Sequence, residues 1–256
     1  MNVTDEVTED GIIERRFELE VDGEVVPGIH WLPEQASGPH PTVLIGHGGS
    51  QHKRVPNILA LGQRLVRDAG YGAVAIDAPA HGDRMTEADR EAARARRDAA
   101  SDGDGQRPPM SRGAARALAE RAPKHVAEWK AVLDELQKQP NSADGPFGYW
   151  GLSMGCAFGM PLVASEPRIT AAVLGLFGLR DGNQAQLDLA QSITIPVLFL
   201  YQSDDELMTR ESGLALWDAL GSERKTLHMN PGGHVAIPRF EQQDAALAFY
   251  RAHLSG

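Results

Sequence analysis

A serine between two glycines is the first feature of this sequence that could carry chemistry. Gly151-Leu152-Ser153-Met154-Gly155 follows an apolar run at residues 147–150 and precedes small and apolar residues that suit a buried helix. At a strand-to-helix turn, Gly-x-Ser-x-Gly holds the serine in a strained backbone conformation and exposes its hydroxyl, and the glycines leave room where the two backbones crowd. The Met154 N–H then lies at a helix start, aimed where negative charge develops on a substrate oxygen. The motif predicts a nucleophile at Ser153.

A serine hydroxyl reacts poorly near neutral pH, so it needs a histidine to take its proton and a carboxylate to orient that histidine. His234 is the best base, because it ends a glycine-rich loop directly after the last predicted strand. Three adjacent acids follow the preceding strand. We predict that Asp205 faces His234, with Asp204 as the alternative, because neighbouring residues on an extended turn point in different directions. We expect Glu206 to be solvated or close to the next helix.

Three further histidines follow the carboxyl ends of predicted strands. His47, His52 and His81 are expected to line the site, either by shaping it or contacting substrate, or by bonding to nearby backbone. Among them, His47 and His81 are predicted to be substrate-binding. Asp77, His81 and Asp83 share one loop but lack a known ligand spacing, so no metal site is predicted there.

The elements that position these residues alternate between strands and helices. Such alternation predicts an α/β fold with a mostly parallel sheet, right-handed crossovers and helices on both faces, and ligands then bind at the carboxyl ends of the strands. A hairpin signal, with Asp22-Gly23 at its turn, precedes this pattern. The predicted strands are residues 12–21, 25–32, 42–45, 73–76, 147–150, 171–176, 195–201 and 225–229, and the main helices are residues 58–69, 124–137, 211–220 and 240–253.

Residues 84–123 differ from this regular alternation. Two short charged helices, at residues 87–100 and 111–122, flank the loop at residues 102–109, and Pro123 is expected to interrupt the second helix. We therefore predict one α/β domain over residues 1–256 that contains a candidate helical insertion, or cap, at residues 84–123. Its polar composition does not favour an apolar cap for long acyl chains.

The order serine, acid, histidine, together with His47-Gly48-Gly49 after an early strand, resembles the α/β-hydrolase family from about residue 43 to residue 253. The likeness is greatest to its small carboxylesterase and dienelactone hydrolase branches. The resemblance implies an eight-stranded sheet, a triad of Ser153, His234 and Asp205, and no cofactor. It also implies an oxyanion hole made by the N–H groups of Met154 and Gly49, with Ser50 as a weaker alternative.

Two positions depart from the commoner pattern of this family. Cys156 stands where many relatives have a second glycine, and we predict that it is a small buried filler. Gln202 replaces the glycine that often begins the acid turn, which leaves Asp204 open as the triad acid.

Composition limits the partners and the compartment. The 256 residues carry a formal net charge of −10 and contain one cysteine, which argues against nucleic acid or an anionic membrane as partner and excludes an intramolecular disulfide. Residues 1–16 are acidic and do not show the basic-then-apolar pattern typical of a signal peptide, and no apolar run approaches about 18 residues. We expect a cytoplasmic protein that acts on a small-molecule acyl substrate.

The sequence thus predicts a serine hydrolase that cleaves an ester through an acyl-enzyme. A thioesterase, lactonase, peptidase or acyltransferase would use the same three groups, because the fold does not fix the leaving group. A catalytically silent, hydrolase-like ligand-binding protein is the alternative from another class.

Overall fold

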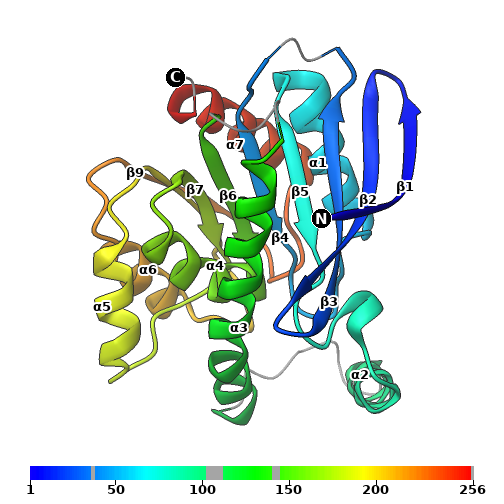
Figure 1. The fold of residues 1–256 in the computed structure, drawn as a ribbon. Helices are drawn as coiled ribbons and strands as arrows, with labels where there is room; N and C mark the ends of the chain where they lie inside the picture. Colours follow the sequence, from blue (N-terminus) through cyan, green and yellow to red (C-terminus); the bar gives the residue numbers. More distant parts are fainter. Residues whose placement is uncertain (36–37, 102–111, 140–144, 255–256) are drawn as a thin grey trace.

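The computed structural model describes residues 1–35, 38–101, 112–139 and 145–254. A nine-stranded sheet in the order β1-β2-β3-β5-β4-β6-β7-β8-β9 runs through the molecule (Figure 1). The strands are β1 Asn2–Glu9, β2 Ile12–Val21, β3 Glu24–Pro33, β4 Thr42–Gly46, β5 Gly72–Ile76, β6 Phe147–Leu152, β7 Ile169–Gly175, β8 Val197–Gln202 and β9 Lys225–Asn230. The helices are α1 Pro56–Ala69, η1 Gly82–Arg84, α2 Glu87–Ser101, α3 Arg112–Leu136, α4 Met154–Ser165, α5 Gln184–Ser192, α6 Arg210–Ala219 and α7 Arg239–His253.

The strands from β4 to β9 pair in parallel, as the alternating sequence predicts. Strands β4, β5 and β8 are buried along their whole length, which explains why they read as continuous apolar runs rather than as alternating ones. Their carboxyl ends lie along one edge of the sheet, and this edge carries the loops that follow each strand.

Three antiparallel strands form the other side of the sheet. The β2–β3 hairpin turns at Asp22 and Gly23, whose φ angles of 51° and 78° belong to the left-handed region. Strand β1 pairs with β2 and makes the sheet nine-stranded, whereas eight strands were expected. Every residue of β1 is exposed, so its sequence lacks the apolar alternation that would have predicted a strand.

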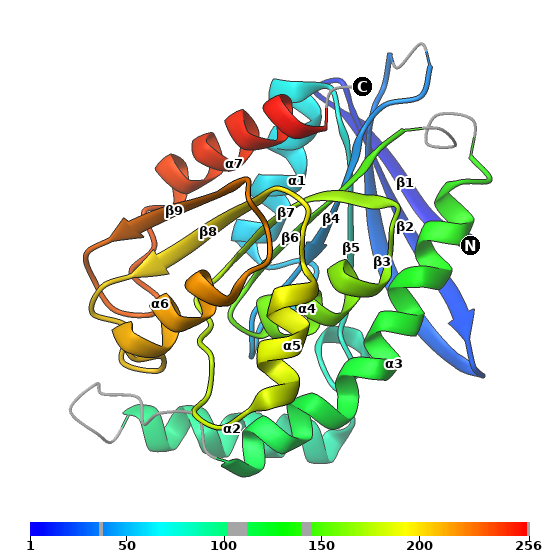
Figure 2. The same ribbon diagram turned by 90° about the vertical axis from the view of Figure 1, so that its left-hand side faces the viewer.

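Helices cover both faces of the sheet (Figure 2). One face packs against α1 and α7, with Trp31, Ile45 and Leu65 in its core. The other packs against α3 and α4, with Trp129 and Tyr149 in its core. The expected helix layers on both faces are confirmed.

Helix α3 differs from its prediction. It is one continuous helix from Arg112 to Leu136 that includes Pro123, so the predicted interruption there is wrong. The apolar stripe of Trp129, Val132, Leu133 and Leu136 is fully buried, and this packing outweighs the local cost of a proline. Pro161 falls inside the helix that Ser153 opens, where the sequence also predicts a kink or an early end, but α4 continues past it to Ser165.

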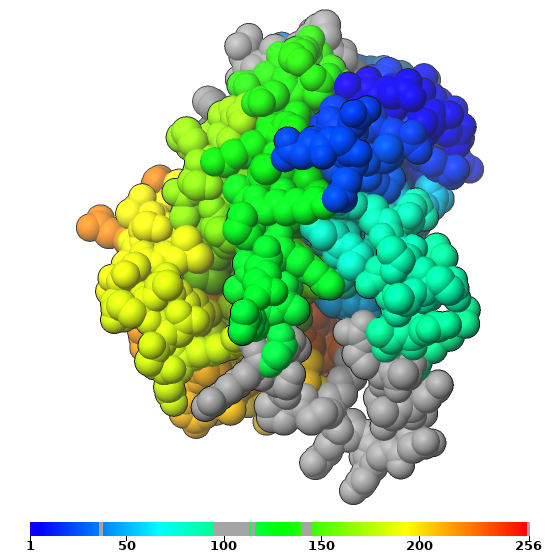
Figure 3. All heavy atoms as spheres, turned by 60° about the horizontal axis from the view of Figure 1, so that its bottom comes forward, coloured from blue at the N-terminus to red at the C-terminus, as the bar shows by residue number. Residues whose placement is uncertain are grey.

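The predicted insertion corresponds to η1, α2 and the first turns of α3, which extend beyond the carboxyl edge of the sheet (Figure 1). Figure 3 looks onto this end of the molecule and shows α3 crossing its centre. The predicted loop at residues 102–109 lies outside the described residues. In the part of the chain that the structure describes, no helix combines the length and apolar character needed to span a bilayer.

Candidate active site

Ser153 occupies the sharp turn between β6 and α4. Its φ of 58° and ψ of −116° are unusual for a residue with a side chain, and its backbone N–H donates to the Gly175 carbonyl at 2.9 Å. This turn ends the strand and starts the helix within one residue, so the hydroxyl projects from the carboxyl edge of the sheet.

The flanking glycines are required by close backbone packing. A Cβ atom at Gly151 would lie 2.4 Å from the Gly155 carbonyl oxygen, and one at Gly155 would lie 2.6 Å from the Gly46 oxygen. The buried Tyr149 hydroxyl donates to the Gly155 carbonyl at 2.7 Å and so fixes the start of α4 against β6. The turn therefore leaves no space for larger residues at either glycine.

The structure brings Ser153, His234 and Asp205 into one hydrogen-bonded row. The Ser153 hydroxyl lies 2.9 Å from His234 Nε2, and His234 Nδ1 lies 2.7 Å from Asp205 Oδ2. Asp205 Oδ1 accepts the N–H groups of Leu207 and Met208, so both of its oxygens are held. This arrangement can take a proton from the serine and hold the resulting imidazolium.

The neighbours of Asp205 also contact the histidine loop, but through its backbone. Asp204 Oδ2 accepts the Gly232 N–H at 2.8 Å, and Glu206 Oε2 accepts the backbone N–H of His234 at 2.8 Å. The structure therefore places Asp205, not Asp204, against the His234 ring. Glu206 is half-buried and lies four residues before α6, as expected, and its bond to the His234 backbone adds a contact that the sequence did not predict.

The backbone amides predicted to form the oxyanion hole are those of Gly49 and Met154. Among the described residues, neither the Gly49 N–H nor the Met154 N–H has a protein acceptor. The adjacent Gly48 N–H is used, because it donates to the Gln51 side chain at 3.0 Å. Gly49 and Met154 thus remain the predicted oxyanion donors.

The predicted substrate-binding histidines have different surroundings. His47 is 3% exposed, its Nε2 accepts the Ala78 N–H at 3.0 Å, and its Nδ1 donates to the Gly48 carbonyl at 2.9 Å. Burial lowers the pKa of His47 to about 3, so the ring is neutral and links two loops, with no ring nitrogen left for a substrate. His81 is half-buried, with Nδ1 bonded to the Pro79 carbonyl at 2.9 Å, and its contact with substrate stays a prediction.

Known proteins resemble this chain over most of its length. The family model of the dienelactone hydrolase family matches residues 26–230. The chain belongs to the dienelactone hydrolase family. No protein with a curated description matches its sequence.

Solved structures share the fold of this dienelactone hydrolase family member. A cold-adapted esterase from an Arctic intertidal metagenomic library is 35% identical, with both chains covered completely and a TM-score of 0.81. Est1E from Butyrivibrio proteoclasticus, solved with ferulic acid, is 18% identical over 94% of this chain and 100% of its own, with a TM-score of 0.68. The Pyrococcus furiosus esterase Pf2001 is 14% identical over 94% of this chain and 93% of its own, with a TM-score of 0.67. The protein is an α/β-hydrolase that acts on carboxylic esters.

Several polar residues of this hydrolase were not assigned a role from the sequence. Gln202 is fully buried, and its amide donates to the Pro231 and Ala236 carbonyls in the histidine loop. Lys53 is buried beside Asp77 and Asp83, the acids considered above for a metal site. No group of side chains suited to a metal ion occurs within the described ranges. A lone glutamine or lysine in a loop carries no pattern from which these contacts could have been predicted.

Proposed function

We propose that this family member is a carboxylesterase-like serine hydrolase in which Ser153, His234 and Asp205 act as the catalytic triad. The observation that carries the proposal is the row of two hydrogen bonds, of 2.9 and 2.7 Å, from the serine hydroxyl through the imidazole to the carboxylate. The strained turn at Ser153 supports the same role, because it holds the hydroxyl away from the backbone.

In the first half of the reaction, Ser153 Oγ attacks the ester carbonyl carbon while His234 Nε2 takes the hydroxyl proton. The carbonyl oxygen becomes an oxyanion, and the N–H groups of Gly49 and Met154 stabilise it. His234 then donates the proton to the departing alcohol, and the acyl group stays on Ser153 as an ester. Asp205 holds the ring in the required tautomer and stabilises its charged form.

In the second half, water replaces the alcohol. His234 takes a proton from this water, the resulting hydroxide attacks the acyl-enzyme, and a second tetrahedral intermediate forms at the same amides. Its collapse returns the proton to Ser153 Oγ and releases the carboxylic acid. No cofactor or metal takes part in these steps.

The test is the turnover of a short ester such as p-nitrophenyl acetate by the wild-type enzyme and by Ser153→Ala. If the three side chains act as a unit, the substitution lowers kcat by about 10⁴-fold or more. Because alanine removes only the hydroxyl oxygen, an unchanged circular dichroism spectrum and melting temperature serve as the control for folding. Activity that survives in Ser153→Ala would remove this serine from the mechanism.

The leaving group is determined by the same assay with a panel of matched acyl donors. An oxygen ester, a thioester, a lactone and an anilide of one acyl group present the same carbonyl and differ in the atom that departs. We expect the oxygen ester to give the largest kcat/KM. A larger kcat/KM on the thioester, the lactone or the anilide would assign that bond instead, and transfer to an added alcohol in preference to water would indicate an acyltransferase.

A further inference from the structure

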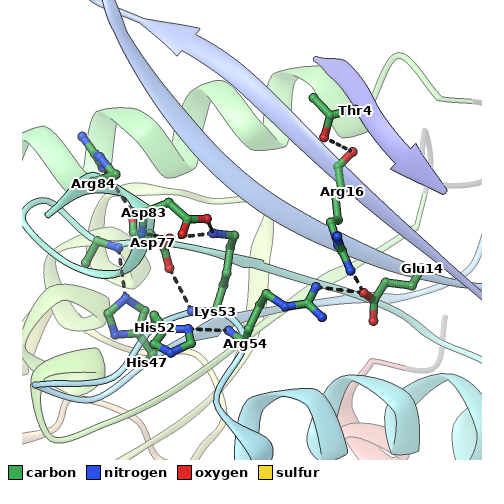
Figure 4. A network of polar contacts seen from close by, with 11 residues as sticks. Thr4, Glu14, Arg16, His47, His52, Lys53, Arg54, Asp77, Asp83 and Arg84 are labelled. Carbon is green, nitrogen blue, oxygen red and sulfur yellow. Dashed lines mark hydrogen bonds and ion pairs between the residues drawn. The ribbon is translucent and has the colours of Figure 1, made fainter. Parts of the chain in front are cut away.

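The loop that carries Gly49 is attached to the loop after β5 at both of its ends. At its start, His47 Nε2 accepts the Ala78 N–H. At its end, the backbone N–H of Lys53 donates to Asp77 Oδ1 at 2.9 Å, and its ammonium donates to Asp77 Oδ2 at 2.6 Å (Figure 4). Residues 48–52 are therefore bracketed by two contacts with adjacent residues of another strand end.

Asp77 is the centre of the second attachment. Its carboxylate is fully buried and accepts three N–H groups, two from Lys53 and one from the Asp83 backbone at 2.9 Å. A Cβ atom at Gly82 would lie 2.2 Å from this carboxylate, so the chain folds tightly around it. These hydrogen bonds and the close approach of Gly82 hold the Asp77 carboxylate in one orientation.

Lys53 is as enclosed as its partner. Its side chain is 5% exposed, and its ammonium also donates to Asp83 Oδ2 at 2.5 Å. The hydrogen bond from Lys53 lowers the pKa of the Asp83 carboxyl. The Lys53 ammonium thus lies between Asp77 and Asp83, the two acids considered above for a metal site. It supplies the positive charge that a metal ion would otherwise bring to them.

A buried ion pair contributes little net stability, because desolvation of both charges opposes their attraction, but it fixes geometry when its hydrogen bonds are satisfied. Here the geometry that it fixes is that of the Gly49 loop. Gly49 and Ser50 are exposed, and Ser50 adopts a φ of 59°, so this segment has few packing contacts of its own to hold it. A donor aimed at a developing oxyanion is effective only if it is held in place before the reaction.

We propose that Lys53 and Asp77 are positioning residues that hold the Gly49 N–H in the oxyanion hole. This inference rests on the proposed function, because it assigns their effect to the tetrahedral intermediates of ester hydrolysis. The pair acts on the transition state and not on the ester in its ground state, so its loss lowers kcat and leaves KM nearly unchanged.

The experiment measures kcat and KM for p-nitrophenyl acetate with Lys53→Met. Methionine keeps the backbone N–H and the length of the side chain and removes only the ammonium. We expect kcat to fall at least about tenfold, because removal of one oxyanion donor costs roughly 10²–10³ and displacement costs less, while KM stays within about threefold of the wild-type value.

The matched control is Lys225→Met. The Lys225 ammonium donates to three backbone carbonyls, those of Trp217, Asp218 and Leu220, at the other end of the parallel strands. Its substitution removes at least as many hydrogen bonds from a lysine and should lower the melting temperature without lowering kcat. This comparison separates a positioning effect from a general loss of stability.

Because Lys53→Met leaves Asp77 buried without a counter-charge, the double variant K53M/D77N provides a second test in case the single variant does not fold. It is neutral at both positions and lacks the ammonium bond. We expect a folded enzyme with the same selective loss of kcat. A kcat within twofold of wild type in either variant, or a change confined to KM, would overturn the proposal. If this happens while Ser153→Ala still abolishes turnover in the same assay, only the positioning role of Lys53 and Asp77 fails, and the proposed serine hydrolase function stands.

Discussion

Two buried histidines, His30 and His47, contribute to how the stability of this protein depends on pH. His30 is 1% exposed, and both of its ring nitrogens lack a partner among the described residues. Burial, followed by the charge of Arg15, lowers the pKa of His30 to about 3, the same value that burial gives His47. Each folded ring therefore stays neutral at a pH at which the unfolded chain would bind a proton.

The sign of this effect is a loss of stability on acidification. An ordinary histidine has a pKa of 6.5, so between about pH 6.5 and pH 3 the unfolded chain binds one more proton per such residue than the folded protein. Each of the two rings then lowers the free energy of unfolding by about 1.4 kcal/mol per pH unit within this window. Above pH 6.5 the ring is neutral in both states, so this loss of stability disappears.

We predict that His30→Leu makes the stability less dependent on pH, because leucine cannot titrate and also removes two unpartnered polar atoms. Urea unfolding at pH 4.5, 5.0 and 5.5 should give a slope about 1.4 kcal/mol per pH unit smaller than that of the wild type. The two proteins should differ least in slope above pH 7. An unchanged slope below pH 6 would show that His30 titrates normally in the folded protein.

The sequence predicts those site residues whose role depends on a local pattern. Ser153 is identified by the two glycines around it, and His234 by a glycine-rich loop after a strand. Asp205 is distinguishable from Asp204 only in the folded protein, where one faces a ring and the other a backbone N–H. The partners of Lys53 lie on a different strand end, so no spacing in the sequence indicates them.

At the scale of elements, the acid turn after β8 is bonded to the histidine loop by four closely spaced side chains. Gln202 donates to two carbonyls of that loop, Asp204 and Glu206 accept two of its N–H groups, and Asp205 holds the His234 ring. After Asp205, Glu206 is the contact nearest to the proposed base, because its oxygen accepts the backbone N–H of His234 itself. The turn therefore sets both the ring and the main chain of the proposed base.

We predict that Glu206→Ala lowers kcat by about tenfold with little change in KM, because the His234 backbone loses its acceptor and a small displacement of a catalytic group is costly. Steady-state kinetics on p-nitrophenyl acetate would measure this effect. Glu206→Gln is the matched control. Its amide oxygen can accept the same N–H, so it should keep kcat within about threefold of wild type. Equal kcat values in Glu206→Ala and the wild type would mean that the loop is held without this carboxylate.

The elements that sequence analysis missed share a physical cause. Strand β1 is wholly exposed, and α5 has one buried residue, Ala190, so neither shows a strong apolar period. Pro123 lies inside α3 because the turns that follow it are anchored in the core. Local propensity is a weak guide where the partner surface supplies most of the free energy.

For the whole molecule, the order of apolar runs was sufficient to predict the parallel sheet and the edge at which the site forms. Residues 153, 205 and 234 are far apart in the sequence, yet each follows a parallel strand, and such strands bring their carboxyl ends together. The precise contacts between the loops depend on packing that no single segment encodes. The sequence thus predicts the architecture better than it predicts the hydrogen bonds that hold the loops of the site together.

The most direct test of the account is to trap the acyl-enzyme. Wild-type protein mixed with p-nitrophenyl acetate and quenched in acid should gain the mass of one acetyl group, located by peptide mapping on Ser153, together with a burst of one equivalent of p-nitrophenol if deacylation is the slower half. A fluorophosphonate should mark the same serine permanently and abolish turnover. An active enzyme that carries the label on another residue, or that is not labelled at all, would contradict the central claim.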